Sequence, residues 1–78
     1  MPDNARYQHN LGVTLHKMGQ YDEALIAEQK AVDLEPDNAE YQDSLSITLD
    51  KVGRQDEAEV AKQKAKDLRK KNLDSSPV

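Results

Sequence analysis

Residues 36–46 read PDNAEYQDSLS, and residues 2–12 read PDNARYQHNLG. Nearly the same phrase therefore returns after 34 residues, and the likeness extends well beyond it. When residues 5–38 are aligned with residues 39–72, 18 of the 34 positions are identical. A fixed period of 20–50 residues is typical of proteins built from stacked structural repeats. The repeat therefore indicates the architecture before any single helix is considered.

Each repeat carries apolar residues at helical spacing. In the first repeat, Tyr7 and Leu11 begin a stripe along one side of a helix. Gly19 follows and can adopt the left-handed conformation that ends helices. The acidic residues at 22–23 suit the first turn of a second helix, and Pro36 ends that helix. The same order recurs in the second repeat, so we expect four helices over residues 4–18, 21–34, 38–52 and 55–71.

The residues that set this pattern point to a known family. Residues 10–36, NLGVTLHKMGQYDEALIAEQKAVDLEP, place Gly12, Gly19, Ala24, Ala31 and Pro36 at offsets that resemble the tetratricopeptide repeat. Residues 45–68 follow the pattern more loosely. The physical reason for the small residues is the close approach of the two helices in each hairpin. The resemblance implies an all-α fold, a right-handed superhelical stack of two antiparallel helix–turn–helix hairpins.

The repeat boundaries divide the chain into four segments. We expect a lead-in at residues 1–4, a first repeat at 5–38, a second repeat at 39–72 and a flexible C-terminal tail at 73–78. Four positions depart from the family pattern: Gln8 and Gln42 stand where a bulky apolar residue is usual, and Glu28 and Lys62 stand where an aromatic residue is frequent. This departure predicts lighter packing between the repeats. In the last helix, Glu59 and Lys66 replace Leu25 and Val32 of the first repeat, which is typical of a polar terminal face.

Composition narrows the classes of function. The net charge of −4 gives no basic footprint for nucleic acid, and the chain has no cysteine. No apolar run approaches the length that spans a membrane, and the N-terminus does not resemble a signal peptide. We therefore expect a soluble cytoplasmic protein whose partners are proteins or peptides, with no nucleic acid, membrane or small-molecule substrate.

No motif in the sequence indicates catalysis. The two histidines, His9 and His16, are seven residues apart, or about 10 Å along a helix axis, so one ion cannot join them without ligands from another helix. They are interpreted as solvated groove residues. No phosphate-binding loop or nucleophile motif is present in the sequence. We expect neither an enzyme, nor a metal site, nor a cofactor.

The family resemblance implies a binding groove on the concave face, which the first helix of each repeat lines. A peptide bound there would be oriented by basic or titratable residues of the first repeat and by mostly acidic residues of the second, with Val13 and Ile47 adding apolar contact. The predicted partner-binding residues are Arg6, His9, Asn10, Val13, His16, Lys17, Glu40, Asp43, Ser44, Ile47, Asp50 and Lys51.

Two alternatives to peptide binding remain open. The groove charges can serve solubility alone. The chain can also be a self-associating structural module, or an excised or engineered fragment of a longer array, since about three repeats are usually needed for stability. The predicted self-association face consists of Tyr7, Thr14 and Met18, which would be partly exposed on the N-terminal side of the stack.

Overall fold

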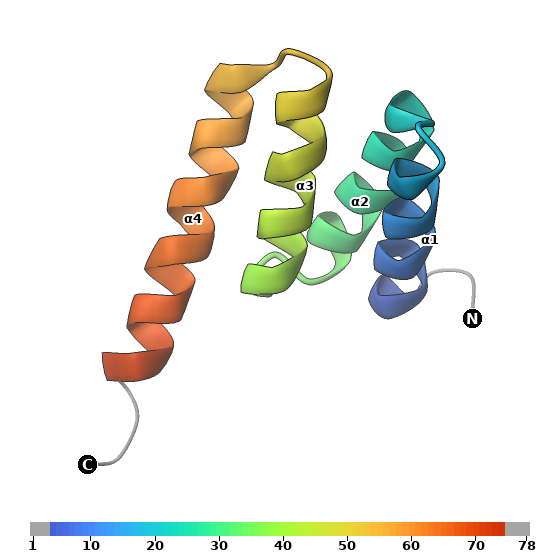
Figure 1. Ribbon diagram of the computed structural model, residues 1–78. Helices are drawn as coiled ribbons and strands as arrows, with labels where there is room; N and C mark the ends of the chain where they lie inside the picture. Colours follow the sequence, from blue (N-terminus) through green and yellow to red (C-terminus); the bar gives the residue numbers. More distant parts are fainter. Residues whose placement is uncertain (1–3, 75–78) are drawn as a thin grey trace.

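The computed structural model describes residues 4–74, and side chains up to Lys71. These residues form four helices and no strand (Figure 1). The helices are α1 (Ala5–Lys17), α2 (Tyr21–Leu34), α3 (Ala39–Lys51) and α4 (Gln55–Asp74). The predicted all-α stack of two antiparallel hairpins is confirmed, with α1 paired to α2, α3 paired to α4, and α2 packed on α3.

The repeated PDNA phrase supplies the start of each odd-numbered helix. The side chain of Asn4 accepts a hydrogen bond from the backbone N–H of Tyr7 at 3.1 Å, and Asn38 accepts one from Tyr41 at the same distance. Each asparagine thereby satisfies an N–H group that has no partner within the helix.

The turns inside both hairpins depend on glycine. Gly19 has a φ of 80° and Gly53 a φ of 84°, and every non-glycine residue described has a negative φ. This left-handed conformation is readily available to glycine and costly for other residues. It lets the chain reverse between helices, as the sequence predicted.

The hairpins are held together by small side chains. Ala24, Ala31, Ala58 and Ala65 are fully buried, with 0% of their surface exposed. Gly12 lies against α2 so closely that an added Cβ would sit 2.4 Å from Cγ of Glu28. The family's small residues therefore act here as expected, by letting the helix axes approach.

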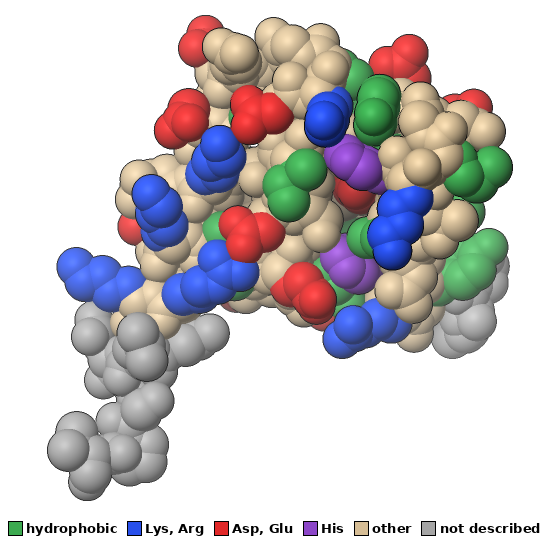
Figure 2. Space-filling model, viewed as in Figure 1, with side chains coloured by type: hydrophobic (Ala, Val, Ile, Leu, Met, Phe, Trp, Pro, Cys, Tyr) green, Lys and Arg blue, Asp and Glu red, His purple; other side chains and the backbone are tan. Residues whose placement is uncertain are grey.

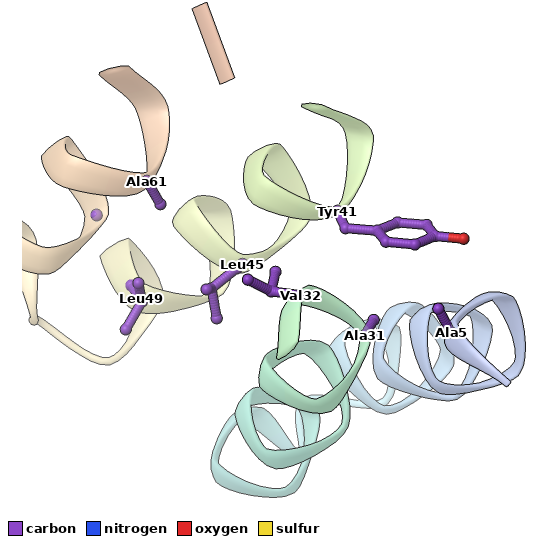
Figure 3. Close-up of a cluster of buried hydrophobic side chains, with 8 residues drawn as sticks. Ala5, Ala31, Val32, Tyr41, Leu45, Leu49 and Ala61 are labelled. Atoms are coloured by element: carbon purple, nitrogen blue, oxygen red, sulfur yellow. The ribbon is translucent and has the colours of Figure 1, made fainter. Parts of the chain in front are cut away.

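A thin apolar core joins the two repeats (Figure 3). Val32 of α2 packs with Leu45 and Leu49 of α3, while Tyr41 extends over α1 and α2 near Ala5. Most other members of this core are alanines, and several polar side chains are buried beside them. The buried polar residues are Gln8, His9, Glu28, Gln42, Ser46 and Thr48. Such a core buries little apolar area per residue, and we therefore expect modest stability.

The last helix is longer than predicted. It continues to Asp74, three residues past the expected end at 71. The position equivalent to Pro36 is Lys70, which can continue a helix where proline ends one. The first two residues of the predicted tail at 73–78 are therefore helical, and residues 75–78 lie outside the described part of the chain, as do residues 1–3 of the predicted lead-in.

Candidate functional site

A hollow between α1 and α3 brings together residues from both repeats. We call it the groove pocket; its volume is about 230 Å³. Val13 of α1 and Ile47 of α3, which occupy equivalent positions in the two repeats, form its apolar walls. Figure 2 shows this face, with the histidines in the hollow between α1 and α3. The complete lining is Val13, His16, Lys17, Glu28, Ser44, Ile47 and Thr48.

Five of the twelve predicted groove residues line this pocket: Val13, His16, Lys17, Ser44 and Ile47. The remaining predicted residues lie around it. Asn10 and Lys51 are exposed, and no described residue forms a salt bridge with Lys51. The sequence therefore located the centre of the hollow but not all of the groups that form it.

The predicted acidic half of the groove is neutralised within the chain. Asp43 pairs with Arg69 of α4. Asp50 pairs with Lys62 of α4 at 3.1 Å. Both ion pairs raise the pKa of the basic partner, through the hydrogen bond to the carboxylate first and its charge second. These carboxylates are thus engaged by α4 and do not form an open acidic surface.

A similar pairing joins the two repeats at the other end of the groove. Arg6 of α1 lies 3.7 Å from Glu40 of α3, and its guanidinium lies 5.9 Å from the centre of the Tyr41 ring. Both charged side chains are largely exposed, so the pair contributes little to stability.

His9 is not a solvated groove residue, which corrects the interpretation from the sequence. Its side chain is only 6% exposed and stacks on Tyr41, with ring centres 4.8 Å apart. Burial lowers the pKa of His9, although the nearby Glu40 charge acts in the opposite direction. The ring is therefore part of the contact between the repeats, and its Nδ1 atom has no hydrogen-bond partner among the described residues.

His16, unlike His9, lines the groove pocket and contacts both α2 and α3. Its Nδ1 lies 2.8 Å from the hydroxyl oxygen of Thr48, which ties α1 to α3. The ring also meets the edge of Tyr21, with centres 5.0 Å apart. His16 remains partly exposed and is therefore within reach of a bound segment.

Two residues of the pocket were missed in the sequence, Glu28 and Thr48. Glu28 lies four residues after Ala24 and three before Ala31, on the buried stripe of α2, and only 2% of its surface is exposed. Burial raises the pKa of Glu28 to about 7, and a hydrogen bond with Thr48 partly opposes this rise. The helical stripe was a signal that could have identified Glu28 as an inward-facing acid.

Other hollows are larger but carry fewer convergent polar groups. One of about 410 Å³ lies beside Leu25, Ile26 and Leu45, and one of about 540 Å³ lies on the outer side of α4 at Val60 and Leu68. Ligand sites combine apolar walls with a small number of positioned polar groups. The groove pocket meets that description because a buried carboxylate, a hydroxyl and an imidazole meet between its walls.

The predicted self-association face is open. Tyr7 is 55% exposed and Met18 63% exposed, and Thr14 is also exposed. The equivalent residues of the second repeat, Tyr41 and Thr48, are buried against the first repeat. The N-terminal side of α1 therefore carries the features of a packing surface without a packed neighbour in the described chain.

These features define a helical-repeat protein of two stacked hairpins. Residues 5–38 match the sequence profile of the tetratricopeptide repeat family, which confirms the resemblance inferred from the sequence. Tetratricopeptide repeats are protein–protein interaction modules and are generally non-catalytic. No curated protein gives a significant sequence match to the chain.

Solved structures of MamA share this fold. A mutant of MamA superimposes with a TM-score of 0.81 at 30% identity, over 86% of this chain and 49% of that one. MamA MSR-1 gives 0.83 at 27% identity, over 91% of this chain and 41% of that one, and MamA AMB-1 gives 0.81 at 30% identity, over 86% and 39%. The chain thus matches less than half the length of each of these MamA chains.

Two features are absent from residues 4–74. No group of three or more His, Cys, Asp or Glu side chains among them is placed to hold a metal ion. None of their helices has the combination of length and apolar character that crossing a bilayer requires.

Proposed function

We propose that this chain binds an extended segment of a partner protein in the groove between α1 and α3, without catalysing a reaction. The observation that carries the proposal is the groove pocket itself, which Val13 and Ile47 line together with the buried Glu28. An extended segment can place one side chain in the pocket while its backbone meets the polar rim. This mode suits a module that generally serves in protein–protein interaction.

The groove side chains that form no salt bridge within the described chain indicate the charge expected of the partner. Because Asp43 and Asp50 are engaged by α4, the cations Lys17 and Lys51 remain at the edge of the groove. They occupy equivalent positions in the two repeats. The rim therefore favours acidic or polar residues flanking the inserted side chain, and salt should weaken their contribution.

Selection from a random peptide library displayed on phage tests this proposal. The bound peptides are then measured against two variants that introduce the same charge at an exposed isoleucine. Ile47→Asp alters the pocket wall, whereas Ile26→Asp alters the far side of α2, and the two isoleucines are similarly exposed, at 52% and 61%. We expect Ile47→Asp to abolish binding and Ile26→Asp to preserve it. Equal binding by both variants would refute the groove.

A second candidate function is self-association through the N-terminal face of α1. The specific observation is the exposure of Tyr7, Leu11 and Met18, at 55%, 38% and 63%. Head-to-tail stacking is disfavoured, because the outward side of α4 presents Glu59 and Lys66. The face is therefore expected to meet the same face of a second copy, in the two-fold arrangement common among dimers.

Sedimentation equilibrium distinguishes this candidate. If the face is an interface, the native chain forms a dimer, Tyr7→Glu gives a monomer, and Val60→Glu on α4 leaves the dimer intact. Val60 is a suitable control because it is an apolar residue that is 70% exposed on another face. A native monomer throughout the micromolar range, or a dimer unaffected by Tyr7→Glu, would remove this candidate.

A further inference from the structure

Glu28 is buried without a full set of partners. Its Oε1 atom is inaccessible and accepts no hydrogen bond from any described residue. No cation of the described chain forms a salt bridge with it, although Lys17 lines the same pocket. Buried carboxylates in proteins are usually paired with a cation or fully hydrogen-bonded.

The repeat pattern does not require an acidic residue at position 28. The equivalent residue of the second repeat is Lys62, which is partly exposed and pairs with Asp50 across its own hairpin. Glu28 instead lies beneath Gly12, with its Cγ where a Cβ on that glycine would be. The absence of a side chain at position 12 is thus what makes room for a carboxylate at the floor of the pocket.

The pocket has the dimensions and lining of a site for one side chain. Its volume, about 230 Å³, is below the roughly 300–1,000 Å³ of pockets that hold drug-sized ligands. The walls are aliphatic, from Val13 and Ile47, and the acid lies at the bottom. An anionic group would be repelled there, whereas an aliphatic stem ending in a cation would contact both the walls and the floor.

We propose that the groove pocket receives a lysine side chain of the partner segment, with its ammonium group paired to the carboxylate of Glu28. This inference rests on the groove function proposed above and specifies the residue that the pocket selects. Lysine fits better than arginine, because an ammonium is compact and its stem flexible, whereas the guanidinium is a wide planar fork. The terminal torsion of a glutamate is soft, so Oε1 can turn toward the entering group.

Binding of an ammonium should be linked to pH. The pKa of Glu28 is raised to about 7 in the free chain, so part of the population must lose a proton to pair with lysine. Affinity for lysine is therefore expected to increase from pH 5.5 to pH 8. The other charged or titratable groups around Glu28 are His16 and Lys17 of α1. A Glu28→Gln variant keeps both and removes only the carboxylate, so it isolates the contribution of Glu28 to the pH dependence.

The test compares two pools of acetylated and amidated random hexapeptides that differ at one central position, fixed as lysine or as norleucine. Norleucine keeps the aliphatic stem and lacks the ammonium group. Binding to the full chain is followed by nuclear magnetic resonance, through the signals of Val13 and Ile47 and the titration of the Glu28 carboxyl carbon. We expect the lysine pool to bind about tenfold more tightly, as a hydrogen-bonded charge predicts, and to lower the Glu28 titration midpoint.

Each variant and each negative result tests a different part of the proposal. Glu28→Gln should remove the preference for lysine, and Glu23→Gln, at an exposed position of the same helix, should retain it. Equal binding of both pools, or a preference that survives Glu28→Gln, would overturn the lysine proposal while the groove function stands. Absence of any perturbation at Val13 and Ile47 with either pool would overturn both. The comparison of pools on the unmodified chain decides the question even if Glu28→Gln does not fold.

Discussion

The first helix and the third helix carry the same residues in different surroundings. Tyr7 is 55% exposed and its equivalent Tyr41 is 2% exposed; Leu11 is 38% exposed and its equivalent Leu45 is 6% exposed. The difference arises because α3 packs on α2, whereas no described helix lies against that side of α1. In a repeat array, the neighbouring repeat decides whether a given stripe of residues forms core or surface.

The largest expected change in stability comes from replacing the equivalent tyrosines Tyr41 and Tyr7. Tyr41→Ala should lower the free energy of unfolding by about 3–5 kcal/mol, as for other buried aromatic residues, because it empties the contact between the repeats. Tyr7→Ala should lower it by less than about 1 kcal/mol. Urea denaturation followed by circular dichroism measures both. Equal losses would mean that the N-terminal face is buried, as in a dimer, and the measurement should then be repeated on dilution.

The contact between Gly12 and Glu28 gives the next effect. Gly12→Ala would place a Cβ 2.4 Å from Cγ of Glu28, and we expect a net loss of about 1–2 kcal/mol after the better helix propensity of alanine is counted. In a Glu28→Ala background the loss should be smaller, because only the backbone oxygen of Ala24, at 3.3 Å, stays close to the added Cβ. Thermal and urea unfolding of the four chains measure this difference. A loss of equal size in both backgrounds would show that the clash lies elsewhere.

The dependence of stability on pH should follow from the two buried titratable groups. The pKa of Glu28 is raised to about 7 in the folded chain, so its contribution is full below the unfolded value near 4.5 and is lost as pH rises through 7. The pKa of His9 is lowered by burial, so its contribution is full above about 6.5 and is lost as pH falls below that value. Below about pH 6.5 the two contributions change in opposite directions and partly offset each other, whereas above it only the loss that comes from Glu28 remains, so stability should fall as pH rises through 7.

Glu28→Gln tests whether Glu28 causes the loss of stability as pH rises. The free energy of unfolding of the variant should not decline as pH rises through 7, and the variant should be more stable than the native chain at pH 8, by about 1–2 kcal/mol. His16 and Lys17 face the same pocket and remain unchanged in this comparison. Exposed Glu23→Gln is the control. If the curves of Glu28→Gln and the native chain run parallel from pH 5 to pH 8, the decline has another source.

The smallest effect is expected at the ion pairs between α3 and α4. Asp50→Asn removes the pair with Lys62, whose side chain is 40% exposed, and we expect little change in stability and none in high salt. Peptide capture should change less than in Ile47→Asp. A loss of capture as large as that of Ile47→Asp would restore Asp50 to the role that the sequence suggested for it.

The sequence predicted the elements well because they depend on local rules. Apolar residues at helical spacing, the left-handed glycines and the 34-residue period predicted the first three helices to within one residue of their observed bounds. The end of α4 was missed because Lys70, unlike proline, places no strict limit on a helix. The resemblance to the tetratricopeptide repeat and the exposure of the N-terminal face were also predicted from the sequence.

The groove was predicted less completely because its contacts join helices distant in sequence. Val13 and Ile47 were identified by repeat equivalence, but the burial of His9 against Tyr41 depends on how α1 lies beside α3. The pairing of Asp43 with Arg69 likewise depends on the crossing of α3 and α4. Glu28 was interpreted as a sign of light packing, although its position on the alanine stripe of α2 was visible in the sequence.

The most direct test of the binding groove is a map of the contact surface at single-residue level. Nitrogen-15 spectra of the chain are recorded with increasing amounts of a selected peptide, and the shift of each amide is followed. The largest shifts should fall on α1 and α3 around Val13, His16, Ser44 and Ile47, with little change at Ile26 and Val60. Largest shifts at Ile26 or Val60, on the opposite or outer faces, would contradict the proposed groove.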